Sequence, residues 1–442
     1  MTTADDSSIT PTMALTAEPV APPERLQVLD ILRGFAILGM VLVHFAQFNP
    51  NRMSGGAIGA AINEVLKELV RGKAHAIFAI LFGVGFAIQL RRADARGEDG
   101  RWRFGRRLLG VALFGMLTAA LAGFSDIIRY AESGVWLLVV RRWSTRSLLV
   151  ALLASAMLYE VWSAAVGGYQ WATMGAERAN EVYQSPPPPA SGALRALDTE
   201  WAAADKGTNF LRLARVQLAW TVRSYRESFW GDWQRSRGDS GRILGSLMDT
   251  TLLTLLIGFL ALRLGIFDRP EEHRRLLVAV MLVGATWWAV YQLKMVPTLW
   301  PAAWAIPSVR VAVAVQSGFG LFRPRFLGLA VAYVAGITLL VRTSRAWERR
   351  LSALFGAAGR MALTNYLLQF VAVDIVFGNY AFGAKAVTPQ IGLAAALVVF
   401  GLLVLFSRWW LTRFRFGPAE WLLRSLTYAQ VQPFRRPTAR AI

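Results

Sequence analysis

The sequence predicts an all-α fold, a polytopic membrane helical bundle of about ten transmembrane helices with both termini in the cytoplasm. Of its 442 residues 55% are hydrophobic, and they include 17 Trp and 25 Phe. Several segments approach or exceed 18 residues with few charges, which is long enough to cross about 30 Å of hydrocarbon. Because backbone polar groups in lipid have to be satisfied within the segment itself, we expect these segments to be helices.

The expected spans alternate with basic connections. The apolar runs lie at about 27–48, 74–90, 106–123, 126–140, 146–168, 243–264, 275–294, 326–342, 361–378 and 391–411. The short connections that are rich in arginine are Arg91–Arg107, Arg141–Arg146, Arg263–Arg275, Arg342–Arg350 and the tail from Arg408. With ten spans, all of these connections fall on the same side as the N-terminus, as the positive-inside rule requires.

This pattern divides the chain into five parts. Residues 1–24 are polar and form a disordered cytoplasmic N-terminus, without the pattern of a signal peptide. Residues 25–168 and 243–428 are the two membrane halves, each with about five spans, and the second ends in an amphipathic segment. Residues 169–242 form an extracytoplasmic loop with a Pro-rich spacer and an interfacial helix over Phe210–Trp233. Residues 429–442 are a basic cytoplasmic tail.

Composition excludes several classes of function. The formal net charge is +20, but the basic residues sit beside apolar runs, so they indicate attraction to membrane lipids rather than to nucleic acid. The chain has no cysteine, which rules out disulfides and thiolate catalysis. It has three histidines and no HExxH-type spacing, so we expect no metal site.

Ionisable residues within or beside the spans gather at one depth. Given the predicted sidedness, an outer-half group comprises His44, His75, Asp126, Glu160, Asp249 and Asp374. Intramembrane ionisable residues usually face the bundle interior or a wet cavity, which favours an outward-facing polar cavity. The alternative for each residue is snorkelling to the interface or a structural hydrogen bond between helices.

Arg33 and His44 share the first span and are eleven residues apart. Eleven steps of about 100° return to within roughly 20° of the start, so both side chains lie on one stripe, about 16 Å apart. Asp30 pairs with Arg33 at spacing i,i+3 near the cytosolic edge. Histidine is suited to proton transfer near neutral pH, and arginine is suited to binding phosphate or carboxylate.

Four motifs, in order across nearly the whole chain, resemble the YeiB-like family of bacterial inner-membrane proteins, a domain of unknown function (418). They are "LDILRGFAILGMVLVH" at Leu29–His44, "FAILFGVGF" at Phe78–Phe86, "GRMALTNYLLQ" at Gly359–Gln369 and "RFGPAEWLLRSLTY" at Arg415–Tyr428. The first span is also similar to that of the transmembrane acyltransferase superfamily, which includes the lysosomal enzyme that N-acetylates heparan sulfate. In that superfamily an arginine is followed, eleven residues on, by a histidine implicated in catalysis. Many YeiB-like members have Asn in place of His44 and a histidine in place of Thr118.

The resemblance implies an inner-membrane protein that moves an acyl group from a cytosolic acyl thioester, with acyl-CoA as donor substrate and no permanently bound cofactor. The acceptor would be an envelope glycan, a lipid or a small molecule. His44 is then the candidate general base and Asp126 its orienting carboxylate. Arg33 would bind the phosphates of the donor. The alternative function is a transporter or flippase in which a protonatable His44 couples transport to protons.

Three further polar residues are candidates for substrate binding. His75 opens the second span beside Lys73, where an interfacial role is the favoured interpretation. Asn365 and Gln369 stand at i,i+4 on the ninth span. A hydrogen bond from either amide to a neighbouring helix is the favoured interpretation there, with substrate binding as the alternative.

Overall fold

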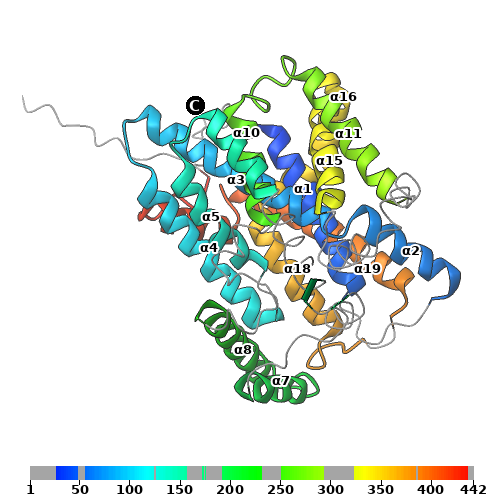
Figure 1. The fold of residues 1–442 in the computed structure, drawn as a ribbon. Helices are drawn as coiled ribbons and strands as arrows, with labels where there is room; N and C mark the ends of the chain where they lie inside the picture. The colour runs from blue at the N-terminus through cyan, green and yellow to red at the C-terminus, as the bar shows by residue number, and fades with distance from the viewer. Residues whose placement is uncertain are drawn as a thin grey trace, which may run out of the picture.

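The computed structural model consists of helices packed around one long apolar core (Figure 1). It describes residues 26–47, 55–123, 126–156, 172–173, 175, 192–230, 250–292, 323–384 and 387–436. Apart from an isolated bridge between Phe414 and Arg435, these residues form helices, turns and connections. The expected all-α class is confirmed.

Each of the ten predicted spans overlaps a helix of the described residues. The correspondence holds for α1 (Gln27–Gln47), α3 (Lys73–Ala95), α4 (Arg101–Ala122), α5 (Asp126–Val140), Thr145–Ala156, α10 (Thr250–Arg263), α11 (Arg274–Gln292), α15 (Arg323–Thr343), α18 (Ala362–Phe377) and α19 (Pro389–Arg413). The sequence did not predict α2 (Gly56–Leu69), α7 (Gly192–Asp205), or the run of α16 (Arg345–Leu351), a π-helical turn (Ser352–Gly356) and α17 (Ala357–Arg360). Helices also lie where the sequence predicts the interfacial helix, α8 (Phe210–Trp230), and the last amphipathic segment, α20 (Pro418–Tyr428).

Four described segments are long and apolar enough to cross a membrane: Gln27–Ala46, Gly56–Ala95, Arg101–Ala122 and Pro389–Arg413. A fifth is obtained if Arg345–Arg360 and Ala362–Phe377, which meet at an angle of 80°, are counted as one broken span. The remaining apolar helices Thr145–Ala156, Thr250–Arg263 and Leu327–Thr343 are shorter.

Close helix contacts depend on glycine. A side chain at Gly359 would collide with the carbonyl of Asp30, and one at Gly34 with the carbonyl of Phe355, so α1 lies directly against the run that ends in α17. Gly83 and Gly258 make the same kind of contact between α3 and α10. Small residues at such crossings let backbones approach, which is how helices gain van der Waals contact in an apolar solvent.

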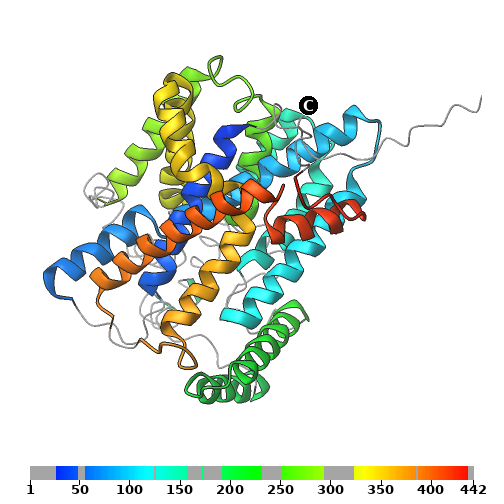
Figure 2. The ribbon, with the colours of Figure 1, turned by 180° about the vertical axis from the view of Figure 1, so that it is seen from behind.

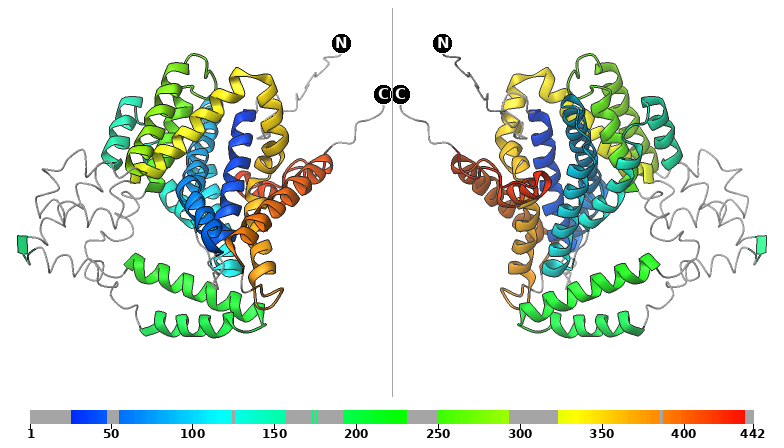
Figure 3. Two further views of the ribbon diagram at one scale, coloured as in Figure 1. Left: turned by 90° about the vertical axis from the view of Figure 1, so that its right-hand side faces the viewer. Right: turned by 90° about the vertical axis from the view of Figure 1, so that its left-hand side faces the viewer.

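Different helices lie at the two ends of the bundle and on its reverse face. In Figure 3, α7 and α8 lie across the end of the bundle opposite to that at which α1 begins. The second half of α18 reaches the same end as α7, because the Asn379 amide contacts the carbonyl of Asp205. On the reverse face of the molecule, α19 runs diagonally and is followed by α20, which packs on α4 (Figure 2).

Candidate functional site

The two histidines of the first two predicted spans meet in the interior. His44, in the last turn of α1, is 2% exposed, and His75 lies in the first turn of α3. Their ring centroids are 6.1 Å apart and nearly perpendicular. The His44 ring also packs 4.7 Å from the ring of Phe370 on α18. His75 is half-buried, so the structure places it beside the buried His44 at the start of α3.

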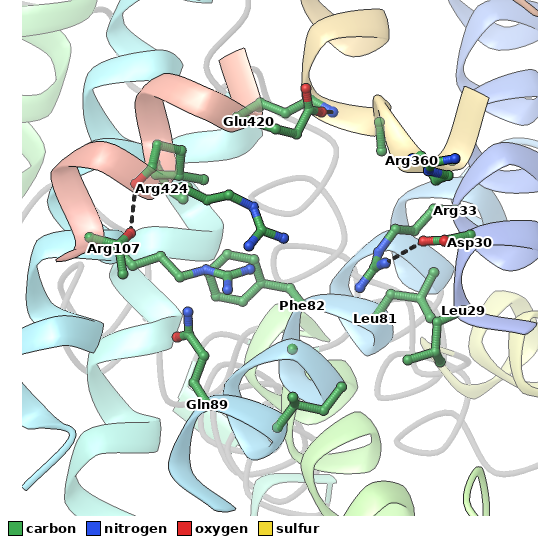
Figure 4. Close-up of a pocket in the computed structure, with 18 of the residues that line it drawn as sticks. Leu29, Asp30, Arg33, Leu81, Phe82, Gln89, Arg107, Arg360, Glu420 and Arg424 are labelled. Carbon is green, nitrogen blue, oxygen red and sulfur yellow. Dashed lines mark hydrogen bonds and ion pairs between the residues drawn. The ribbon is translucent and has the colours of Figure 1, made fainter. Parts of the chain in front are cut away.

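Arg33 lies on the same helix in a different environment. Its guanidinium donates to the Asp30 carboxylate at 3.0 Å, as the i,i+3 spacing predicts. Both residues line a cavity of about 280 Å³ between α1, α3, α4, α18 and α20 (Figure 4). The cavity is therefore at the end of the bundle where α1 begins.

This cavity is strongly cationic. Its charged lining consists of Arg33, Arg91, Arg92, Arg107, Arg360 and Arg424, against the carboxylates of Asp30 and Glu420. Figure 4 shows the Arg33 guanidinium reaching in from one side, and those of Arg107 and Arg424 from the other. Arg91 also pairs with Asp268, outside the lining. Six guanidinium groups against three carboxylates leave an excess of three positive charges, which suits a ligand with several anionic oxygens. We call this cavity the arginine pocket.

Arg107 is the arginine that the sequence alone gave no reason to select. It lies in the run that the positive-inside rule assigns to a cytoplasmic loop, but α4 already begins at Arg101. Its guanidinium stacks over the Phe82 ring at 5.2 Å, and its enclosed Nε has no hydrogen-bond partner among the described residues. The guanidinium also lies beside Gly85 on α3, a contact between helices that no local sequence pattern indicates.

Glu420 caps the N-terminus of α18, which follows the helix break and forms part of the pocket wall. Its carboxylate accepts hydrogen bonds from the backbone N–H of Leu363 at 2.6 Å and of Thr364 at 3.1 Å, and from the Thr364 hydroxyl at 2.6 Å. These donors belong to the first turn of α18, whose N–H groups lack partners within the helix. Burial raises the pKa of the Glu420 carboxyl, and the hydrogen bonds with Thr364 oppose that shift.

Aromatic rings fill the interior between the arginine pocket and the histidine pair. Phe78, which lines the pocket, lies 6.4 Å from Tyr366, and Tyr366 lies 5.0 Å from Phe370, the ring that packs on His44. Tyr130 also lines the pocket, and its hydroxyl donates to the carbonyl of His75 at 3.3 Å. The two ends of α1 are thus connected by packed rings, and Tyr366 and Phe370 are fully buried.

The structure separates the two amides predicted on the ninth span. Asn365 donates to the carbonyl of Ala358 at 3.0 Å and to the hydroxyl of Ser407 on α19 at 2.9 Å, which confirms a structural bond between helices. Gln369 is equally buried, but neither of its amide atoms has a hydrogen-bond partner among the described residues. Asp126 is the first residue of α5, and its side chain lies outside the described part. Glu160 and Asp249 are also outside it.

Comparisons with known proteins cover both halves of the chain. Residues 261–430 match the family model described as "Protein of unknown function (DUF418)". Residues 25–155 match the model described as "Heparan-alpha-glucosaminide N-acetyltransferase, catalytic". The predicted resemblance is confirmed. The second match includes Arg33, His44, His75 and Asp126.

Similar full-length proteins carry no assigned activity in their names. The chain is 26% identical to "Uncharacterized protein YxaH" of Bacillus subtilis, over 95% of this chain and 98% of that one. It is also 26% identical to "Uncharacterized protein YeiB" of Escherichia coli, over 94% of this chain and 100% of that one. No solved structure matches the chain. Together with the apolar helices, these relatives indicate a membrane protein.

Proposed function

We propose that the protein is a membrane acyltransferase that takes an acyl group from an acyl-CoA on the cytosolic side and transfers it to an envelope glycan, a lipid or a small acceptor. The observation that carries the proposal is the contact between the buried His44 and the half-buried His75, in a segment that matches an acetyltransferase catalytic model. Few side chains other than histidine transfer protons efficiently near neutral pH, and this fold brings two of them together.

In this mechanism His44 acts as the general base. It takes the proton of the acceptor hydroxyl or amine as that group attacks the thioester carbonyl, and it returns the proton to the leaving thiolate. Asp126 would orient an imidazole in the pair, as a carboxylate does in many acid–base sites. Lysine and arginine are not suited to this step, because both are charged near neutral pH unless their environment lowers their pKa.

The arginine pocket supplies a complementary place for the donor. Its guanidinium groups suit the phosphates of a coenzyme A ester, and its apolar lining, which includes Leu81, Phe82 and Val111, suits the rest of an amphiphilic molecule. Arg33, which the sequence proposes as a ligand of the donor's phosphates, would be one of several such ligands in this pocket. Since the rings of Phe78, Tyr366 and Phe370 fill the interior beyond the pocket, passage of an acyl group to His44 requires these rings to move.

The proposed topology has about ten spans in the bacterial inner membrane, with both termini and the arginine pocket on the cytoplasmic side. It is supported by the arginine-rich connections on that side and by the position of α7 and α8 across the opposite end of the bundle (Figure 3). The donor and the acceptor would then enter from opposite sides of the membrane.

One observation favours transport as a second candidate. The 80° bend at Met361 divides a span into two half-helices, and the first residues of α18 face the arginine pocket. Transporters commonly place their substrate sites at such breaks, usually in pairs. A protonatable His44 would then couple anion movement to protons. Flux of an anion into proteoliposomes without any acyl donor would support this function, whereas product formation that depends on the donor would support the acyltransferase.

The test is release of free thiol from acetyl-CoA by the purified protein in detergent, with mixed sugars and amines as acceptors. The chain has no cysteine, so a thiol-reactive chromophore reads only the coenzyme A released. We expect His44→Ala to lose at least about 100-fold in kcat. His273→Ala is the matched control, because His273 lies in the turn between α10 and α11, outside the pair. Equal rates for the two variants would remove His44 from the mechanism.

A further inference from the structure

Gln369 is a buried side chain whose hydrogen-bonding groups are unused. It lies on the inner face of α18 with 0% of its surface exposed, and both its Oε1 and its Nε2 lack hydrogen-bond partners among the described residues. Buried polar atoms in folded proteins nearly always have partners, so an amide with none at either atom needs an explanation. A ligand that provides the partner is one such explanation.

The neighbouring amide shows what a structural role looks like in the same helix. Asn365 precedes Gln369 by one turn, and four residues at about 100° each place the two on one stripe of α18. Asn365 is fully buried as well, yet it bonds to Ala358 and Ser407. The described residues thus satisfy the Asn365 amide and supply no hydrogen bond to the Gln369 amide one turn later.

Gln369 also lies at the depth of the histidine pair. Phe370 follows it directly, and the ring of Phe370 is 4.7 Å from that of His44. Along a helix neighbouring residues differ by about 1.5 Å in height and about 100° in direction, so Gln369 leaves α18 at the depth of the histidine pair, on the stripe beside that of Phe370.

We propose that Gln369 is a catalytic residue whose Nε2–H donates a hydrogen bond to the carbonyl oxygen of the acyl thioester. The inference rests on the proposed acyl transfer. When the acceptor oxygen or nitrogen bonds to the carbonyl carbon, the carbonyl π electrons move to the oxygen, and the Gln369 amide stabilises that oxyanion. His44 holds the acceptor proton meanwhile. The carbonyl re-forms as the C–S bond breaks, and the thiolate leaves and receives the proton.

A donor that is held ready in a dry site is effective because it needs no rearrangement when the charge develops. Removing one such donor typically costs about 100-fold to 1000-fold in kcat. The free protein meanwhile carries a buried amide without a partner, which is a stability cost. Activity and stability should therefore respond in opposite directions when Gln369 is replaced by an apolar side chain of similar length.

The experiment compares Gln369→Met with Asn365→Leu in thermal unfolding and in thiol release from acetyl-CoA. For Gln369→Met we expect kcat to fall about 100-fold, the KM for acetyl-CoA to stay within about threefold, and Tm to stay level or rise by about 2 °C. For Asn365→Leu we expect a lower Tm and an unchanged kcat per folded molecule. The contrast distinguishes a catalytic amide from a structural one, because only the former affects kcat without lowering Tm.

Two results would overturn the role of Gln369 alone. They are wild-type kcat in Gln369→Met while the unsubstituted protein is active, or loss of folded protein in both Gln369→Met and Gln369→Ala. The first would show that the reaction does not use the amide, and the second that the amide holds the core together. No thiol release from the unsubstituted protein would instead overturn the proposed acyl transfer, and the catalytic role with it.

Discussion

The two ends of α1 surround their polar residues in opposite ways. At the end where the helix begins, Arg33 pairs with Asp30 in a cavity that carries five more arginines. Near the other end, His44 is enclosed by rings, including those of His75 and Phe370. A cluster of permanent cations attracts and holds anions, whereas an enclosed imidazole can exchange a proton without competition from water. The two roles proposed for α1, anion binding and proton transfer, therefore fall in separate electrostatic environments of one helix.

The difference predicts that substitutions at the two ends affect different kinetic constants. Arg107→Ala should raise the KM for acetyl-CoA by about 30-fold or more, since a charge-assisted hydrogen bond to phosphate contributes about 2–3 kcal/mol. Its kcat should stay within about threefold. His44→Ala should show the reverse pattern, with kcat reduced and KM little changed. Steady-state thiol release over a range of acetyl-CoA concentrations measures both constants.

The control for Arg107→Ala is Arg101→Ala. Arg101 belongs to the same basic run, but it is exposed and pairs with Asp99. It should leave KM unchanged at moderate ionic strength, because exposed charges are screened. An equal rise of KM in both variants would mean that general positive charge, and not the arginine pocket, attracts the donor.

Replacing Glu420 tests whether the arginine pocket depends on the hydrogen bonds that hold the first turn of α18. Glu420→Ala removes three hydrogen bonds from the first turn of α18 and should lower the free energy of unfolding by about 2 kcal/mol. Thr412→Ala is a matched control on the exposed surface, where the hydroxyl bonds only within its own helix. Chemical denaturation in detergent would measure both. A loss below about 0.5 kcal/mol for Glu420→Ala would contradict the capping role.

The pH dependence of stability at the same residue has a definite sign. Burial raises the folded-state pKa of Glu420 above its ordinary value of 4.5, so the folded protein binds this proton more tightly than the unfolded chain does. The resulting stabilisation is complete below pH 4.5 and is lost as the pH rises through the folded-state pKa. The difference in unfolding free energy between wild type and Glu420→Gln should therefore decrease over that range. An increase with pH would show that the carboxylate is favoured in the folded state.

The sequence predicted the helices that carry Arg33 and His44, but not which side chains surround these two residues. The apolar runs and the arginine-rich connections between them predicted where most of the long helices lie. The spacing of eleven residues predicted that Arg33 and His44 share one stripe of α1. The sequence placed His44 and His75 at one depth but did not predict that their rings would lie side by side. Arg107 and Glu420 were missed as partners of the pocket, because their roles come from contacts between helices distant in sequence. Local pattern also gave no means of telling Asn365 from Gln369, since only packing shows which amide is satisfied.

The smallest effect on stability and activity is expected for Tyr130, which contacts both the arginine pocket and the histidine pair. The Tyr130 ring lines the arginine pocket, while its hydroxyl donates to the carbonyl of His75 at 3.3 Å. Tyr130→Phe keeps the ring and removes one long hydrogen bond, so it should cost about 0.5–1 kcal/mol of unfolding free energy and leave kcat and KM within about twofold. If kcat instead falls tenfold or more, the hydroxyl takes part in the reaction. Binding and proton transfer would then be coupled through Tyr130, and the separation between the arginine end and the histidine end would not hold.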